Sequence, residues 1–517
     1  MQRSWWREGV FYQIYPRSYQ DTNGDGIGDL RGVIQRLDHL KGKPDSLGID
    51  AIWLSPFYRS PMADYGYDVA DYRDVDPIFG TLADADELVS EAHARGIRVI
   101  VDLVPGHTSN QHPWFAAARS RREDPKRDWY VWANPARGGG PPNNWLAVFG
   151  KRRSAWTFEP NTGQYYMHHF LPEQPDLNWW NEEVRNAIED VMRFWLDRGV
   201  DGFRIDVAHG LIRDEQLRSN PRFRVRGRPR LRNWDLDEVH KIHRRWRKVL
   251  DSYEGERMAV GEVDVQDLAR LTRYYGNDDE LQLSFNFYFL ERPWRADAFR
   301  DVVEKWESLL PPHAWPDYTL SNHDRKRAAT RYGRERARVA AMLLMTLRGT
   351  PFIYYGEEIG MTDVPIPPER VVDVHDRDGC RTPMQWDASR NAGFTTGDPW
   401  LPMAADADRV NVAAQRADPR SLLSFYRRLL ATRRASDALR VGAYRTLPSA
   451  RGVFAYERVA DGERAYVALN FTAQERGVDL PARELVLSTD EHRESLSRDG
   501  RIALGPNEGL IARAPSR

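Results

Sequence analysis

The sequence predicts an α/β fold: a (β/α)8 TIM barrel with an inserted lid domain after its third strand and an all-β domain at its C-terminal end. Short apolar runs alternate with helical patterns over most of the 517 residues, which is typical of βα units around a parallel sheet. From about residue 440 the pattern changes to alternating strands with tight turns. Eight runs, the number that a barrel needs, are predicted as its strands: 11–17, 51–56, 98–104, 202–207, 258–263, 283–289, 318–323 and 352–356.

The first strand leads into a glycine-rich turn with the sequence DTNGDGIGD, at residues 21–29. The twelfth position of this loop is Gly32 instead of a glutamate, and no helix precedes it, so it is not an EF-hand. A capped turn without metal is the alternative to a metal site. Oxygen ligands of the kind that Ca²⁺ prefers stand at alternating positions: Asp21, Asn23, Asp25 and Asp29.

The interval between the third and fourth strands is far longer than the others and is rich in Gly, Pro, Asn and Trp. Such a long stretch is usually functional or a small domain, and we interpret it as a lid over the barrel mouth. In the C-terminal part, Asp461-Gly462 is a strong signal for a hairpin. The predicted domains are the barrel in two parts (1–104 and 178–438), the inserted domain (105–177) and a C-terminal β-sandwich (439–517).

A helix is predicted over 181–199, directly before the fourth strand. Its apolar residues recur at helical spacing and Gly199 stands where a helix commonly stops. The apolar positions are Val184, Ile188, Val191, Phe194 and Trp195.

Three of the predicted strands end at an acidic residue, in the segments GFRIDVAH, VGEV and LSNHD. These acids are Asp206, Glu262 and Asp324, and a parallel barrel could converge them on one mouth. Cleavage of a glycosidic bond needs one carboxylate to attack, one carboxylic acid to protonate the leaving oxygen, and negative charge near the transition state. An isolated acid at a strand end is often only a helix cap or half of an ion pair. The spacing of these three acids and the sequence segments that surround them favour a catalytic role.

The composition excludes several classes of protein. Lysine and arginine total 75 against 76 acidic residues, a net charge of −1, which does not favour nucleic acid or an anionic membrane as partner. Cys380 is the single cysteine, no run of eighteen apolar residues occurs, and the N-terminal segment lacks the pattern of a signal peptide. We expect a cytoplasmic enzyme for a small neutral substrate, present as a monomer or homodimer, with the Arg-rich run at 222–232 as a solvated loop on the rim of the mouth.

The segments DLVPGHTS (102–109), GFRIDVAH, VGEV and SNHD follow one another in the order of the conserved regions of the α-amylase superfamily and resemble them. With QPDLN at 174–178 and RTPMQWD at 381–387, the chain resembles the oligo-1,6-glucosidase and α-glucosidase branch of glycoside hydrolase family thirteen. The resemblance implies that Asp206 is the nucleophile, Glu262 the general acid and base, and Asp324 the acid that holds the sugar hydroxyls.

The same resemblance implies a set of substrate-binding residues. Arg204 points to the same side of its strand as Asp206, so it is expected to keep the nucleophile ionised. The turn at 21–29 is expected to bind a structural Ca²⁺ through its side-chain oxygens and the carbonyl of Ile27. The other expected sugar contacts are Asp64, Tyr67, His107, Phe149, Phe170, His323 and Arg377, with Arg381 as the alternative to Arg377.

Together these features predict a retaining, exo-acting α-glucosidase that forms a covalent glucosyl intermediate, which water or a sugar acceptor can resolve. Val207 accompanies α-1,6 activity in this branch, but Ala208-His209 departs from the usual α-1,6 pattern, so the linkage stays open. The alternatives are a glucosyltransferase or isomerase of the trehalose synthase or sucrose isomerase type, a catalytically silent scaffold, and a nucleic-acid or other binding module that uses the Arg-rich run.

Overall fold

The computed structural model describes residues 3–150, 153–221, 231–265, 267–373, 375–496 and 501–514. The Arg-rich run predicted as a rim loop lies outside the described residues, apart from Leu231 and Arg232. The chain forms two compact units, one made of residues 1–53, 90–98 and 286–517 and the other of residues 54–89 and 99–285.

The central sheet has eight strands in the order β11-β10-β9-β5-β2-β1-β13-β12. Every barrel pair whose register is described is parallel. Together with the helices that alternate with these strands along the chain, this arrangement confirms the predicted (β/α)8 barrel. The strands are β1 (Phe11–Ile14), β2 (Ala51–Leu54), β5 (Arg98–Leu103), β9 (Gly202–Ile205), β10 (Met258–Gly261), β11 (Leu283–Ser284), β12 (Asp317–Thr319) and β13 (Thr350–Tyr354).

Helix α5 (Glu182–Asp197) confirms the helix predicted over 181–199. It begins where the Asn181 side chain accepts a hydrogen bond from the Glu183 amide, and Gly199 follows its end at φ +94°. The other helices are α1 (Trp5–Glu8), α2 (Leu30–Leu40), α3 (Leu82–Ala94), α6 (Val239–Asp251), α7 (Leu268–Leu271), α8 (Phe287–Leu290), α9 (Ala296–Leu309), α10 (Ala328–Tyr332), α11 (Ala337–Thr346), α12 (Val412–Ala417), α13 (Leu422–Arg434) and α14 (Asp437–Val441).

The prediction of a strand over 283–289 is wrong for the second half of that range. Only Leu283–Ser284 pairs as β11, and Phe287–Leu290 forms helix α8. The Asn286 side chain accepts a hydrogen bond from the Phe289 amide at 3.1 Å and so caps the helix. An aromatic run fits the buried face of a strand or a helix equally well, and the cap decides between them.

The inserted segment contains helix α4 (Pro113–Ser120) and a small antiparallel sheet of order β6-β8-β7. Its strands are β6 (Trp132–Ala133), β7 (Trp156–Glu159) and β8 (Gln164–Met167). Trp145, Ala155, Trp156 and Met167 form its buried core. A separate antiparallel pair, β3 (Tyr58–Arg59) and β4 (Asp71–Val75), follows the second barrel strand. The predicted domain boundaries at 104/105, 177/178 and 438/439 stay predictions.

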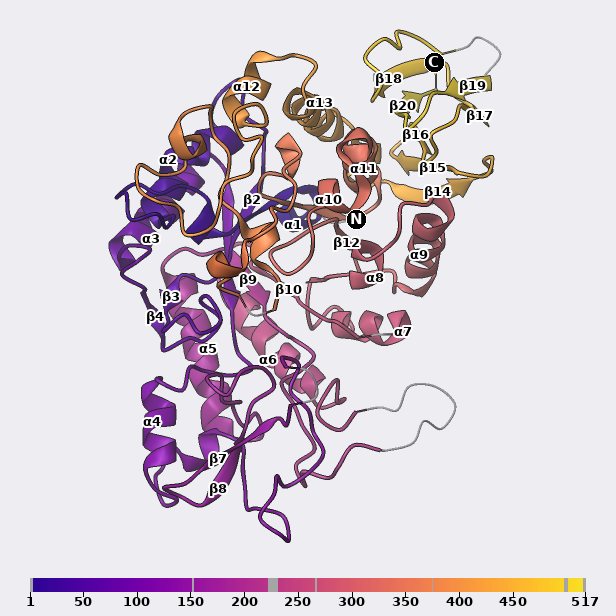
Figure 1. Cartoon of the computed structure of the whole chain (residues 1–517). Coiled ribbons are helices and arrows are strands. Elements are labelled where there is room, and N and C mark those ends of the chain that lie inside the picture. Colours follow the sequence, from indigo (N-terminus) through magenta and orange to yellow (C-terminus); the bar gives the residue numbers. More distant parts are fainter. Residues whose placement is uncertain are drawn as a thin grey trace. The chain divides into compact units, whose positions relative to one another are not determined.

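The C-terminal strands, yellow in Figure 1, form an antiparallel sheet of order β14-β15-β16-β20-β18 and the pair β17-β19. Residues of both sheets share one buried core. The predicted hairpin is confirmed, because Asp461 (φ +44°) and Gly462 (φ +84°) connect β15 to β16. The strands are β14 (Ala443–Leu447), β15 (Val453–Ala460), β16 (Glu463–Asn470), β17 (Arg476–Asp479), β18 (Glu484–Ser488), β19 (Arg501–Leu504) and β20 (Gly509–Arg513).

Among the helices in the described ranges, we find none long and apolar enough to cross a membrane. Cys380 is a buried free thiol.

Candidate active site

Two of the three predicted catalytic acids follow neighbouring strands of the barrel. Strand β9 pairs in parallel with β10, and Ile205 lies opposite Gly261 at their carboxyl ends. Asp206 and Glu262 are the next residues of each strand, so they leave the sheet at the same edge. The Asp206 amide donates to the Leu103 carbonyl and the Glu262 amide donates to the Ile205 carbonyl, both at 2.9 Å, which fixes both backbones.

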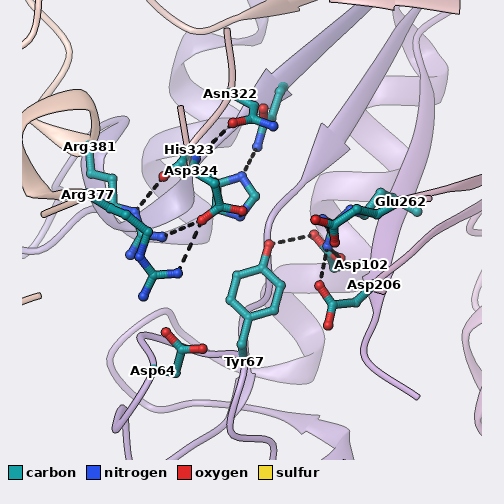
Figure 2. A network of polar contacts seen from close by, with 12 residues as sticks. Asp64, Tyr67, Asp102, Asp206, Glu262, Asn322, His323, Asp324, Arg377 and Arg381 are labelled. Carbon is teal, nitrogen blue, oxygen red and sulfur yellow. Dashed lines mark hydrogen bonds and ion pairs between the residues drawn. The ribbon is translucent and has the colours of Figure 1, made fainter. Parts of the chain in front are cut away.

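The buried guanidinium of Arg204 connects three carboxyls, and we call this set the Arg204 cluster. Nη1 donates to Asp206 Oδ1 at 2.7 Å and to Asp102 Oδ1 at 2.6 Å, and Nη2 donates to Glu262 Oε2 at 2.5 Å. Arg204 is only 2% exposed, so these charge-assisted bonds are shielded from water. Figure 2 shows Asp102, Asp206 and Glu262 gathered around one point.

Burial raises the pKa of Asp206 well above its ordinary value, and the charges of Glu262 and Asp102 act in the same direction. Arg204 lowers this pKa, but burial outweighs it, so the expectation that Arg204 keeps the nucleophile ionised stays a prediction. Arg204 donates to both Asp206 and Glu262, so it holds these two carboxyls near each other. The neighbouring carboxyls therefore favour the protonated form of Asp206, and Arg204 favours its ionised form.

Val207, directly after the predicted nucleophile, has φ +42°. This is an outlier for a β-branched residue. In this conformation the Val207 amide donates to Glu262 Oε2 at 3.2 Å. The strained backbone therefore adds a second donor to the carboxylate that Arg204 already contacts.

A second set of predicted sugar contacts lies in the same unit. The Tyr67 hydroxyl donates to Asp102 Oδ2 at 3.2 Å, which links this set to the Arg204 cluster. His107 Nε2 lies 2.9 Å from the Tyr67 carbonyl oxygen, and burial lowers the pKa of His107, which favours the neutral form of its ring. The Gln174 amide nitrogen lies 3.1 Å from Asp64 Oδ2 and 3.0 Å from His107 Nε2. We call Asp64, Tyr67, His107 and Gln174 the Asp64 group.

The two predicted phenylalanines extend the Asp64 group. The Phe170 ring lies 5.4 Å from the His107 ring, and the Phe149 ring lies 5.2 Å from that of Phe170. These contacts place the Phe170 ring beside the predicted sugar-binding histidine and the Phe149 ring beside Phe170, and all three residues belong to the inserted segment.

The third predicted acid, Asp324, belongs to the other compact unit. Arg377 Nη1 and Arg381 Nη2 donate to Asp324 Oδ1 at 3.2 and 2.9 Å, and His323 Nε2 lies 3.3 Å from Oδ2. Asp373 holds Arg377 through two bonds of 2.8 Å. Both arginines named as alternatives therefore contact this acid (Figure 2). The convergence of all three acids on one mouth stays a prediction.

Two residues of these groups were not singled out from the sequence. Asp102 lies near the carboxyl end of its strand, level with Arg204, and it begins the DLVPGHTS segment, so a local signal for it existed. Gln174 is the first residue of QPDLN, which served only as a marker of the family branch. No local pattern marks a glutamine as the partner of an acid 110 residues earlier in the chain.

The turn at 21–29 has the donor chemistry for Ca²⁺, but its first carboxylate is already engaged. Asp21 Oδ1 accepts from the amides of Asn23 and Gly24, and Oδ2 accepts from the Gly26 amide and the Thr395 hydroxyl. A metal would have to displace one of these bonds, because a carboxylate has about four lone-pair sites. Among the described residues, no group of three or more His, Cys, Asp or Glu side chains is placed to hold a metal. Asp29 caps helix α2.

Residues 13–442 match the model of the alpha amylase catalytic domain. The chain is 41% identical to a probable alpha-glucosidase of Rhizobium meliloti (strain 1021) over 93% of this chain and 92% of that one. It is 39% identical to an oligo-1,6-glucosidase of Heyndrickxia coagulans over 92% and 94%. Among solved structures, an alpha-glucosyl transfer enzyme, XgtA, superposes with a TM-score of 0.92 at 41% identity and covers 99% of this chain and 100% of that one.

Proposed function

Because the chain belongs to the α-amylase family and is a glycoside hydrolase, we propose that it is a retaining, exo-acting α-glucosidase that removes terminal α-linked glucose from short oligosaccharides. The observation that carries this proposal is the Arg204 guanidinium, which donates to both Asp206 and Glu262 and so holds the two carboxyls near each other. Retaining enzymes keep their two carboxyls about 5–5.5 Å apart, whereas inverting enzymes leave room for a water between carboxyls about 6.5–9.5 Å apart.

In the proposed mechanism, Asp206 attacks the anomeric carbon and forms a glucosyl ester. Glu262 gives its proton to the leaving glycosidic oxygen and then, as a carboxylate, takes a proton from the water that hydrolyses the ester. This division needs Asp206 ionised and Glu262 protonated when substrate binds, and Arg204 favours the ionised form of Asp206 because its charge lowers the pKa of that carboxyl. Arg204 stays fixed between them and compensates the charge that moves from one carboxyl to the other.

We assign Asp324 to the sugar hydroxyls of the same glucose by the family resemblance, together with Asp64, Tyr67, His107 and His323. The buried contacts of the Asp64 group support a closed end behind that glucose, since Gln174 contacts both Asp64 and His107 and all three side chains are buried. A closed end accepts only non-reducing termini, so disaccharides should react faster than starch.

The test of the mechanism combines product stereochemistry with chemical trapping. Hydrolysis of an α-glucoside, followed by NMR, should release α-glucose first. A fluorinated α-glucosyl fluoride, whose enzyme-bound ester hydrolyses slowly, should leave a glucosyl ester on Asp206 that peptide mass spectrometry locates. Initial release of β-glucose, or a label on another carboxyl, would contradict the assignment.

Glucosyl transfer is the second candidate, and the similarity to an alpha-glucosyl transfer enzyme at 41% identity favours it specifically. The same ester serves both reactions, and the acceptor decides between them. Products from maltose, isomaltose, sucrose and trehalose, with and without added sugar or alcohol acceptors, separate hydrolysis, transfer and isomerisation. The same panel determines the linkage preference.

We also propose that the turn at 21–29 binds a structural Ca²⁺ through Asp21, Asn23, Asp25, Asp29 and the Ile27 carbonyl. Asp25 supports this, because it is exposed and each of its oxygens accepts only one described bond, from the Ile27 amide and from the Asn23 side chain.

A further inference from the structure

Gln174, the first residue of QPDLN, is completely buried, and its amide has a defined orientation. The side-chain oxygen Oε1 of Gln174 accepts a hydrogen bond from the backbone amide of Leu171 at 3.1 Å. The backbone amide of Gln174 donates to the Leu171 carbonyl at 2.9 Å. Because a backbone N–H needs an acceptor, the side-chain oxygen must face Leu171. The NH₂ group therefore faces the opposite way, toward Asp64 and His107.

The two hydrogens of this NH₂ group match its two neighbours. One donates to Asp64 Oδ2, a charge-assisted bond that selects one orientation of the carboxylate. The other faces His107 Nε2, which also lies 2.9 Å from the Tyr67 carbonyl. A neutral imidazole either donates from Nε2 to the Tyr67 carbonyl or accepts there from Gln174. Gln174 thus influences both the orientation of the Asp64 carboxylate and the choice of the ring nitrogen of His107 that carries the proton.

The backbone of the QPDLN segment is held tightly against the segment that bears His107. His107 and Asp176 form an isolated antiparallel bridge. The Leu177 amide donates to the Gly106 carbonyl at 3.1 Å, and the Thr108 amide donates to the Pro175 carbonyl at 3.2 Å. Gln174 therefore cannot follow Asp64 if that side chain moves.

Asp176 anchors the segment from the other side. This carboxylate is 1% exposed and lies 2.6 Å from Arg213 Nη2 and 2.8 Å from His169 Nδ1. Burial alone would raise its pKa, but Arg213 and His169 together hold the pKa of Asp176 below its ordinary value. A buried ion pair of this kind is costly to break, which makes the segment a rigid support.

We propose that Gln174 is a positioning residue that orients the carboxylate of Asp64 and the ring of His107 toward the non-reducing glucose, with Asp176 as the anchor that fixes Gln174. This inference rests on the proposed function, because the roles of Asp64 and His107 come from the family resemblance. Gln174 acts through its two partners and does not itself touch the sugar.

Gln174→Glu is the sharpest test, because it keeps the size of the side chain and replaces the donor with a carboxyl beside Asp64. At low pH this carboxyl is protonated and donates to Asp64 as the amide does. At higher pH both groups ionise and repel each other. The ratio of kcat/KM between variant and wild type should fall as pH rises and reach a loss of about 100-fold, the usual cost of a displaced substrate-positioning group. Gln174→Met, which has no donor, should show its loss at every pH.

Gln164→Glu is the matched control. Gln164 also lies in the inserted segment, and its Oε1 accepts from Arg127 Nη2 at 2.6 Å, so a carboxylate there gains a partner. Its ratio of kcat/KM to the wild type should not change with pH. A Gln174→Glu loss that is the same at every pH, or activity near wild type throughout, would overturn the proposal.

A second measurement uses glucosides that lack the 4- or the 6-hydroxyl at the non-reducing end. If Gln174 positions Asp64, removal of the hydroxyl that Asp64 holds should cost the wild type much more than it costs Gln174→Met. Equal costs in both proteins would show that Gln174 only stabilises the fold. Failure of the wild type to cleave any α-glucoside would instead reject the proposed function, so the two failures are distinguishable.

Discussion

Arg204→Lys tests the Arg204 cluster most directly. The guanidinium donates to three carboxyls from two separate nitrogens, and one lysine ammonium cannot span that arrangement. We expect about two of the three charge-assisted bonds to be lost, at about 1.5–3 kcal/mol each, a total of about 3–6 kcal/mol. If half of this appears in the transition state, kcat/KM falls by about 10- to 100-fold, and the rest lowers the free energy of unfolding.

The pH profile gives this prediction a direction that a general loss of stability would not produce. Because Arg204 lowers the pKa of Asp206, a weaker cation lets that pKa rise further. The nucleophile must be ionised, so the acidic limb of kcat/KM should move to higher pH in the variant. The assay is steady-state hydrolysis of an aryl α-glucoside over a pH series, with chemical denaturation of both proteins in parallel.

Arg127→Lys is the control for this experiment. Arg127 is 6% exposed in the same compact unit, but its guanidinium donates to neutral acceptors, the Ala118 carbonyl and Gln164 Oε1. It should lose stability and keep both its kcat/KM and its acidic limb. If Arg204→Lys behaves like Arg127→Lys, or if its acidic limb stays in place, the reasoning about the cluster is refuted.

Three further predictions concern other parts of the molecule. Asp206→Asn should abolish turnover and leave the circular dichroism spectrum unchanged, because the amide cannot attack and has nearly the same volume; appreciable residual activity would place the nucleophile elsewhere. Burial raises the pKa of Glu357 from 4.5 to about 7, so its stabilising contribution is complete below pH 4.5 and is lost as pH rises through 7. Chemical denaturation should therefore show that the free energy of unfolding of Glu357→Gln, relative to that of the wild type, is up to about 3 kcal/mol higher at pH 8 than at pH 5. An equal difference between the two proteins at both pH values would contradict this. Chelation of Ca²⁺ should lower Tm more than kcat, since the ion would stabilise the native turn at 21–29 by mass action; a loss of activity with no change in Tm would oppose a structural role.

The sequence predicts the parts of the site that depend on local pattern. Asp206 and Glu262 follow apolar runs, and parallel pairing of those runs as β9 and β10 brings both acids to one edge of the sheet. Arg204 could be placed beside Asp206 because alternate residues of a strand share a face. Its bond to Glu262 joins residues 58 positions apart, and no periodicity within one strand contains that information.

The aromatic run and the glutamine show two different limits of sequence reasoning. Strand propensity favours extending the sixth barrel strand through Phe287 and Phe289, but the side-chain bond of Asn286 to a backbone amide starts a helix there. The Gln174 side chain is uncharged and does not titrate, so its importance depends wholly on which groups surround it in space.

The charge of the Arg204 cluster has a practical consequence. Three carboxyls face a single guanidinium, so the cluster stays negative even when one of the carboxyls is protonated. A small organic cation is attracted to such a place by the same field that stabilises an oxocarbenium ion. Primary-amine buffers should therefore compete with substrate, and sugar-shaped amines should be the natural starting point for inhibitors of this enzyme.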